Sequence, residues 1–354
     1  MAKWNARIRI VVLMLLAASL LSGCAGSSLI PSATSASGTA TRDFFAMNTY
    51  MTITVNGTDA KAAADAAVTA VNDLEQSLSR NIASSEISAI NGKAGVSPVA
   101  VSKETYGLIK SAVEYSARTD GVFDITIAPV MDVWGFTDGN YRVPAQSEID
   151  TALAKVDYTK IILSDADSTV FLSETGMSID LGGIAKGYAS DVVQTVIKSY
   201  DVSSAMISLG GNVAVFGKKA DSSLFKIAIT DPVNPDQYIG ILEATDVSVI
   251  TSGGYERFFT EGGVTYIHIM DPATGSPVKS DLLSVTIVTP DGTEGDALST
   301  ALFVMGRDKA IEYGRTHTDF SFVLVTATGE LVVSSALKDS FTPTDSSAVV
   351  TYAD

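Results

Sequence analysis

The segment DLGGIAKGYASD, residues 180–191, has the composition of a phosphate-binding loop but matches neither common phosphate motif. A Walker A loop ends in Gly-Lys followed by Ser or Thr, whereas Lys186 is followed by Gly187. The dinucleotide fingerprint G-x-G-x-x-G does not fit Gly182, Gly183 and Gly187 either. A strand, two glycines and a helix in this order place free backbone amides at a helix N-terminus, where an anion is stabilised. A tight strand-to-helix turn with an exposed lysine would explain the segment equally well.

A second segment, GVFDITIAPVMDVWGF at residues 121–136, carries one acidic side chain among apolar ones. We expect Asp124 to lie inside a strand, where a carboxylate must find a partner or shift its pKa. Ordinary packing in a core accounts for Trp134 and Phe136, but it does not account for Asp124.

A third segment, residues 251–278, contains His268, one of two histidines in the chain. We expect His268 on a strand, next to a D-P-x-T-G turn that begins at Asp271. A histidine beside a carboxylate can act as a general base or hold a phosphate, with Asp271 as the second candidate base. An isolated strand histidine is usually structural, so this segment alone leaves both readings open. His317, in the polar segment RTHTD, is typical of a solvated surface.

A fourth segment, GDALSTALFVMG at residues 295–306, has Asp296 and Thr300 four residues apart at the expected start of a helix. This spacing puts both side chains on one helix face. Carboxylate and hydroxyl oxygens are hard ligands that suit Mg²⁺. An N-cap aspartate followed by a helical threonine is the competing interpretation.

Residues 1–23 have the pattern of an export signal. Lys3, Arg7 and Arg9 precede the apolar run IVVLMLLAASLL, which is too short to be a good spanning helix. The run ends in LSGC, which resembles the bacterial lipobox, so we expect Cys24 to be lipidated and to become the mature N-terminus. An ordinary secretory signal followed by a chance cysteine is the alternative. Cys24 is the single cysteine, which excludes an intrachain disulfide framework and a cysteine metal site.

The chain is acidic, with a formal net charge of -16. This charge disfavours binding to nucleic acid or to anionic lipid by electrostatics. Attachment to a membrane would therefore depend on acyl chains at Cys24. The small and polar residues 25–41 predict a flexible tether between the lipidated cysteine and the folded domain. We predict that residues 42–339 form the domain and that residues 340–354 form a C-terminal tail.

Hydrophobic periodicity predicts an α+β fold with mostly antiparallel sheets and packed helices. A strand is expected from Phe44 onward, and two strands are expected between residues 160 and 180. The predicted helices cover residues 59–79, 103–117, 147–155, 184–199, 297–305 and 308–315. The remaining predicted strands cover residues 204–209, 213–217, 224–230, 246–250, 264–270, 282–288, 321–326 and 330–334.

Together these segments resemble the ApbE family, the FAD:protein FMN transferases, from about Phe44 to Val333. The resemblance rests on motifs that occur in the family's order. They are MNTY, LSxxxxxSEISxxN, GxFDxTxxPxxxxWGF, DLGGIAKGYAxD, SLGGNV, ITDP, TSGxYxRFF, HIxDPxTGxP and DALST.

The resemblance implies a two-lobed fold related to the tunnelling fold, with FAD as substrate between the lobes and Mg²⁺ as cofactor. A Thr or Ser hydroxyl of an exported acceptor protein would attack the FMN-side phosphorus, and AMP would leave. Lys186 and the 180–187 loop would hold the pyrophosphate, and His268 or Asp271 would accept the hydroxyl proton. The backbone carbonyl of Gly183, with Asp296 and Thr300, would bind the metal. The remaining residues implied to contact FAD are Met47, Val122, Phe123, Asp124, Asp180 and His268.

Two positions depart from the family pattern. The customary Met-Gly-Thr is Met47-Asn48-Thr49 here, and a position that often carries an aromatic able to stack on flavin is Asn81. A missing stacking partner leaves room for a second reaction, in which water replaces the acceptor hydroxyl and FAD is hydrolysed to FMN and AMP. A lipid-anchored flavin carrier without turnover is a third reading, but it would not need Asp296 and Thr300 beside a phosphate loop.

Overall fold

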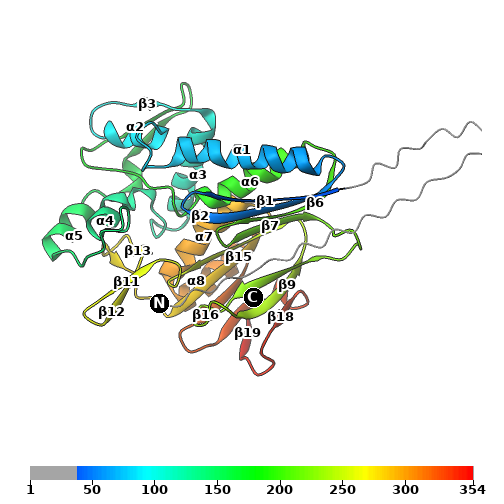
Figure 1. The fold of residues 1–354 in the computed structure, drawn as a ribbon. Helices are drawn as coiled ribbons and strands as arrows, with labels where there is room; N and C mark the ends of the chain where they lie inside the picture. Colours follow the sequence, from blue (N-terminus) through cyan, green and yellow to red (C-terminus); the bar gives the residue numbers. More distant parts are fainter. Residues whose placement is uncertain (1–37, 354) are drawn as a thin grey trace, which may run out of the picture. The chain divides into compact units, whose positions relative to one another are not determined.

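A nine-stranded sheet runs through the computed structural model, which describes residues 38–353 (Figure 1). Neighbouring strands pair antiparallel except for the last two, β17 and β19, which are parallel. The strands, in their order across the sheet, are β1 Gly38–Ala46, β2 Thr49–Gly57, β6 Val202–Leu209, β7 Asn212–Gly217, β10 Val247–Gly253, β15 Leu282–Thr289, β16 Ser321–Thr326, β17 Leu331–Ser334 and β19 Val350–Ala353.

Helices cover one face of this sheet. In α1, Ala60–Leu78, the buried residues recur every three or four positions, so a single apolar stripe faces the strands. Next to it lie α6, Ala185–Lys198, and α7, Gly292–Met305, followed by α8, Arg307–Thr316. The contacts α1–α6 and α6–α7 place these helices side by side across β1, β2, β6, β7, β10 and β15. The loop before α6 and the start of α7 are therefore brought together.

A smaller sheet packs on the other face. Its strands, in the order β18-β9-β8, are β18 Phe341–Pro343, β9 Tyr238–Ala244 and β8 Phe225–Thr230. Ile227 and Ile229 of β8 share one hydrophobic core with Val215 and Val249 of the large sheet. The fold therefore has three layers, with helices, the nine-stranded sheet and the three-stranded sheet in succession (Figure 1).

The chain between α1 and α6 forms a mainly helical region with a small three-stranded sheet. Two short hairpins, between β10 and β15, complete the fold. The elements between α1 and α6 are α2 Glu86–Gly92, β3 Val99–Ala100, α3 Lys103–Arg118, η1 Ile125–Ile127, α4 Ala128–Val133, α5 Gln146–Leu153, η2 Tyr158–Lys160, β4 Ile161–Ser164 and β5 Thr169–Leu172. The hairpin strands are β11 Phe258–Glu261, β12 Val264–Ile267, β13 Met270–Asp271 and β14 Ser276–Pro277.

The predicted α+β class with mostly antiparallel sheets is confirmed. Both predicted domain boundaries differ from the structure, because β1 begins at Gly38 and the expected tail contributes β18 and β19, which pair with β9 and β17. The two expected lobes are parts of one compact unit within the described residues. The predicted signal, Cys24 and most of the tether lie outside residues 38–353. No helix within these residues is long and apolar enough to cross a membrane.

Candidate active site

The N-terminal ends of α6 and α7 cross at two glycines. A Cβ atom on Gly187 would lie 2.0 Å from the carbonyl oxygen of Gly292, so a side chain there would collide with backbone. The close approach lets the amide of Gly187 donate a 2.8 Å hydrogen bond to Oδ2 of Asp296. Lys186 Nζ lies 4.0 Å from Oδ1 of the same carboxylate. The sequence prediction that Asp296 and the glycine loop form one site is consistent with this geometry.

Asp296 is not a helix cap, contrary to one interpretation of the sequence. Helix α7 begins at Gly292, and the side chain of Asp291 caps it by accepting a hydrogen bond from the amide of Glu294. Asp296 therefore lies inside the helix, with an exposed fraction of only 3%. From the sequence this helix is predicted to begin at residue 297, because the glycines at positions 292 and 295 disfavour a helix in isolation.

Gly183 and Thr300 lie next to each other. A Cβ atom on Gly183 would be 3.5 Å from Oγ1 of Thr300 and 3.3 Å from the ring of Phe123. The Thr300 hydroxyl is also 3.4 Å from Oγ of Ser252, which in turn contacts Ser299 at 2.8 Å. The three predicted metal-binding residues, Gly183, Asp296 and Thr300, therefore line one small region of loop and helix.

Asp180 orders the glycine loop. Its Oδ1 accepts a 2.7 Å hydrogen bond from the amide of Gly182, and its Oδ2 lies 3.4 Å from the guanidinium of Arg80. The same guanidinium donates to Asp132 at 2.9 Å. Sequence reasoning missed Arg80, although it directly precedes Asn81, because its carboxylate partners are 52 and 100 residues away along the chain. The side chain of Asn81 itself is exposed.

The strand expected around Asp124 is wrong. Asp124 caps the short helix η1, and its carboxylate accepts hydrogen bonds from the amide and hydroxyl of Thr126 and from the amide of Tyr158. Burial raises the pKa of Asp124, and these hydrogen bonds partly oppose the rise. Periodicity alone does not distinguish a strand from a helix in a short apolar run. The carboxylate holds the backbone at Thr126 and Tyr158 and the hydroxyl of Thr126. Val122 and Phe123 precede it, with Phe123 against Gly183.

Met47 lies in the tight turn between β1 and β2. Met47 and Asn48 both have positive φ angles, 48° and 59°, which a two-residue hairpin turn of this hand requires. Asparagine tolerates this conformation better than most residues, so Asn48 is an adequate replacement for the customary glycine. The amide of Met47 donates a 2.8 Å hydrogen bond to Glu75 of α1. The turn is therefore fixed to the helix layer.

His268 lies in a bend between β12 and β13, and not on a strand as expected. Its backbone amide and Nδ1 both contact the carbonyl oxygen of Arg257, at 3.0 and 3.1 Å. Since a carbonyl oxygen only accepts, Nδ1 carries the proton and Nε2 is the free acceptor. Burial, with the positive charges of Arg257 and Lys186, lowers the pKa of His268 to about 3. The imidazole is therefore neutral near pH 7.

Asp271 has a structural role in the hairpin that follows. Its Oδ1 accepts a hydrogen bond from the amide of Ala273 at 2.9 Å, and its Oδ2 accepts one from the Thr274 hydroxyl at 3.1 Å. This arrangement stabilises the D-P-x-T-G turn. Of the two predicted bases, His268 has the acceptor atom, Nε2, that makes no hydrogen bond with any residue from 38 to 353.

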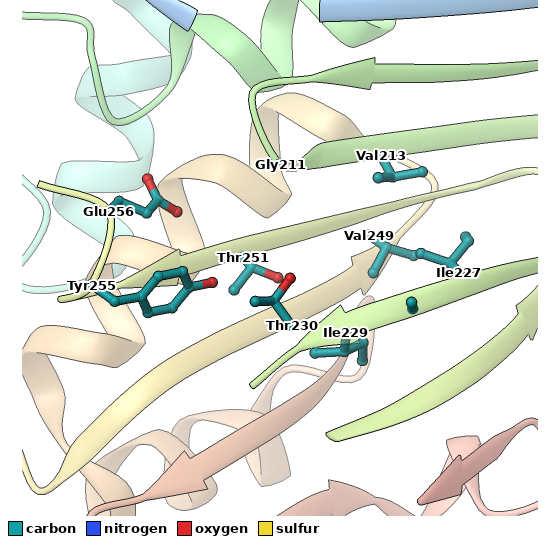
Figure 2. Close-up of a pocket in the computed structure, with 10 residues that line it drawn as sticks. Gly211, Val213, Ile227, Ile229, Thr230, Val249, Thr251, Tyr255 and Glu256 are labelled. Carbon is teal, nitrogen blue, oxygen red and sulfur yellow. The ribbon is translucent and has the colours of Figure 1, made fainter. Parts of the chain in front are cut away.

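A cavity of about 50 Å³ lies between the two sheets, and sequence reasoning did not find it (Figure 2). Its apolar side is formed by Val213, Ile227, Ile229 and Val249, and its polar end by Thr230, Thr251, Tyr255 and Glu256. Burial is the main cause that raises the pKa of Glu256; the charge of Asp296 adds to the rise, and that of Lys186 opposes it.

Known proteins resemble this chain along most of its length. The model of the ApbE family matches residues 47–324. A curated FAD:protein FMN transferase of Klebsiella pneumoniae is 36% identical over 273 residues, which are 77% of this chain and 84% of the relative. Another, from Treponema pallidum, is 34% identical over 263 residues, with 70% and 73% of the two chains covered.

Solved structures of ApbE proteins also resemble the fold of this chain. The crystal structure of the ApbE protein from Thermotoga maritima superposes with a TM-score of 0.80 at 34% identity, covering 85% of this chain and 98% of that chain. The flavin transferase ApbE from Vibrio cholerae gives a TM-score of 0.78 at 26% identity, covering 86% and 99%. From the glycine loop, the helix crossing and these matches together, it follows that this chain belongs to the ApbE family.

Proposed function

We propose that this protein is an FAD:protein FMN transferase, which attaches FMN to a Thr or Ser hydroxyl of an acceptor protein and releases AMP. The main observation behind this proposal is that the glycine loop lies against Asp296 and Thr300. Backbone amides, a lysine and hard oxygen ligands lie together there, as a pyrophosphate substrate requires. The curated relatives have the same activity in their names.

The residues at the crossing suit Mg²⁺. Asp296 Oδ1 makes no hydrogen bond within residues 38–353, and the Thr300 hydroxyl lies beside Gly183. The ligand atoms that these three residues offer a metal are all oxygens. Residues 38–353 contain no cluster of three or more His, Cys, Asp or Glu side chains able to hold a metal, so hydroxyl and backbone oxygens would have to contribute. The ion would be held by Asp296, Thr300 and the Gly183 carbonyl. When bound, it would neutralise charge on the phosphates.

The chain's own residues would position the reacting groups. Lys186 would hold the pyrophosphate, while Met47, Phe123 and Asp180 would line the rest of the FAD site. The amides of Gly182 and Gly187 already donate to Asp180 and Asp296, so they order the loop and do not bind the phosphates directly. The acceptor oxygen forms a bond to the FMN-side phosphorus as the bond to the AMP oxygen breaks, and AMP leaves with that oxygen. His268 Nε2 would take the hydroxyl proton, since Nδ1 is held by Arg257.

The same site could use water in place of the acceptor hydroxyl. Asn81 is exposed and provides no aromatic ring for the flavin, which favours some FAD hydrolysis to FMN and AMP as a second activity. Co-expression with exported proteins of the source bacterium would distinguish FMN transfer from FAD hydrolysis. Transfer predicts a fluorescent flavin band on a denaturing gel, and hydrolysis alone predicts AMP and FMN with no such band.

We also propose that the protein is exported and anchored by lipid at Cys24 to the outer face of the cell membrane, where its acceptor would be found. Cys24→Ala is expected to release the protein from the membrane fraction or to leave the signal uncleaved. FAD turnover should be unchanged, because residue 24 lies outside the catalytic domain. Normal membrane attachment of a correctly processed Cys24→Ala protein would contradict the lipid anchor.

A further inference from the structure

Helices α6 and α7 have the same Gly-x-x-x-Asp spacing near their N-terminal ends, and each helix uses it to bind the other. The pair is Gly187 and Asp191 in α6, and Gly292 and Asp296 in α7. Besides the bond from Gly187 to Asp296, the amide of Gly292 donates a 2.8 Å hydrogen bond to Oδ1 of Asp191. The first amides of a helix have no partner within that helix. Each carboxylate therefore satisfies an amide at the start of the neighbouring helix.

The two carboxylates differ in how much of each is engaged. Oδ2 of Asp191 accepts hydrogen bonds from the amide and the hydroxyl of Thr293, at 2.8 and 2.6 Å, so both oxygens of Asp191 are bonded. Asp296 accepts the Gly187 amide through Oδ2 alone, and its Oδ1 lies 4.0 Å from Lys186 Nζ. Asp191 is therefore fully used in holding α7, whereas Asp296 keeps one oxygen for a ligand.

Asp191 fixes the place of the first turn of α7. A Cβ atom on Gly292 would lie 2.8 Å from Oδ1 of Asp191 and 2.7 Å from the carbonyl oxygen of Gly187, so this turn has no room to move closer to α6. Three hydrogen bonds to a carboxylate, which are stronger than neutral ones, keep it from moving away. Asp296 follows Gly292 by about one helical turn, so its position depends on that of the first turn.

We propose that Asp191 is a positioning residue for the transfer reaction, which holds the first turn of α7 against α6 and so presents Oδ1 of Asp296 to Mg²⁺ beside Lys186. This inference rests on the proposed transferase function and adds a residue that touches neither FAD nor the metal. Replacing a group that orients a metal ligand typically lowers metal affinity or activity by about 10–100-fold.

Three substitutions test the hydrogen bonds of Asp191. Asp191→Asn keeps the size of the side chain but replaces one acceptor oxygen by an NH₂ group, which then faces a donor of Gly292 or Thr293. Thr293→Val removes only the hydroxyl donor, and Thr293→Ser restores it. The matched control is Thr286→Val, which removes a buried hydroxyl that pairs at 2.8 Å with Thr251, a residue lining the cavity between the two sheets.

The first measurement is the Mg²⁺ concentration that gives half-maximal AMP release from FAD, with the exported protein that the wild-type chain labels. Asp191→Asn should raise this concentration about tenfold or more, and Thr293→Val about threefold. Thr293→Ser and Thr286→Val should match wild type. Saturating Mg²⁺ should bring the rate and the KM for FAD of every variant to within about twofold of wild type.

A purely structural role would instead lower the rate by the same factor at every Mg²⁺ concentration, through loss of folded protein. That result, or an unchanged Mg²⁺ requirement in Asp191→Asn, would overturn the proposal. If Asp191→Asn does not fold, Thr293→Val compared with Thr286→Val decides the question, and an equal Mg²⁺ requirement in these two variants would contradict the role of Asp191.

Hydrogen exchange of the metal-free protein without FAD measures the same link independently of activity. The Gly187 amide should exchange about tenfold faster in Asp191→Asn than in wild type, because its acceptor on α7 is no longer held in place, while amides of residues 51–55 in β2 are unaffected. Unchanged exchange at Gly187, or equally faster exchange in β2, would contradict the proposal. Faster exchange at Gly187 alone, in a protein whose wild type neither releases AMP nor labels an acceptor, would leave the helix contact standing and reject the transferase function.

Discussion

The backbone amide of Gly187 donates a 2.8 Å hydrogen bond to Oδ2 of Asp296, which lies 109 residues further along the chain. This bond ties the phosphate loop at the start of α6 to the buried carboxylate of α7. Only a glycine at position 187 lets the two helices approach closely enough for it to form. The same contact leaves the other carboxylate oxygen, Oδ1, facing Lys186.

Gly187→Ala should destabilise the protein, because the new Cβ would lie 2.0 Å from the Gly292 carbonyl oxygen and the helices would have to separate. We expect a loss of about 1–3 kcal/mol in the free energy of unfolding, as for other overpacked sites. The control is Gly107→Ala in α3, where a Cβ meets nothing within 4 Å. That variant should gain about 0.5–1 kcal/mol from helix propensity. Urea denaturation measures both, and equal stability of the two variants would contradict the close helix crossing.

His268 should make stability fall in acid. Its pKa is about 3 in the folded protein against 6.5 for the free side chain, so the unfolded chain takes up a proton first as the pH falls from about 6.5 to about 3. The free energy of unfolding should then fall by up to about 1.4 kcal/mol per pH unit, and the histidine should have no effect above pH 6.5. Urea denaturation of wild type and His268→Gln at pH 7, 6, 5 and 4 measures the difference.

Asp191, whose pKa is raised to about 6 chiefly by burial, gives the opposite slope between about pH 4 and 6. Its contribution is present in both proteins and cancels in the comparison. If the stability difference between wild type and His268→Gln is the same at every pH, the histidine is not held neutral by its surroundings.

The sequence predicts some parts of this structure better than others. The repeated buried positions of α1 give the helix directly, because each turn presents the same apolar face. The apolar run around Asp124 has no such period, and its carboxylate works through hydrogen bonds to Thr126 and Tyr158 that only the folded chain reveals. Arg80 and the cavity beside β8 depend on long-range packing, which motif reading does not capture. The grouping of Gly183 with Thr300 was expected from the family resemblance alone.

Asn81→Tyr tests whether the missing aromatic ring weakens the hold on FAD. Asn81 is exposed and follows Arg80, which contacts the loop residue Asp180 at 3.4 Å. A stacked tyrosine is worth about 0.5–1.5 kcal/mol, so the purified variant should retain FAD about twofold to tenfold better. It should also release less AMP without acceptor, because a flavin ring held in one place leaves the FMN-side phosphorus less accessible to attack by water. Equal FAD content and equal AMP release would mean that residue 81 does not face the flavin.

The most direct measurement of the central claim is the amount of AMP released per flavin attached to the acceptor, with Mg²⁺ and after removal of divalent metal. Wild-type protein with excess acceptor should approach one AMP per covalent flavin, and metal removal should abolish both products. Asp296→Asn keeps the size of the side chain but loses its charge, and should lower both rates by about a hundredfold or more. Full activity of the metal-free enzyme or of Asp296→Asn, or AMP release with no covalent flavin, would contradict the account.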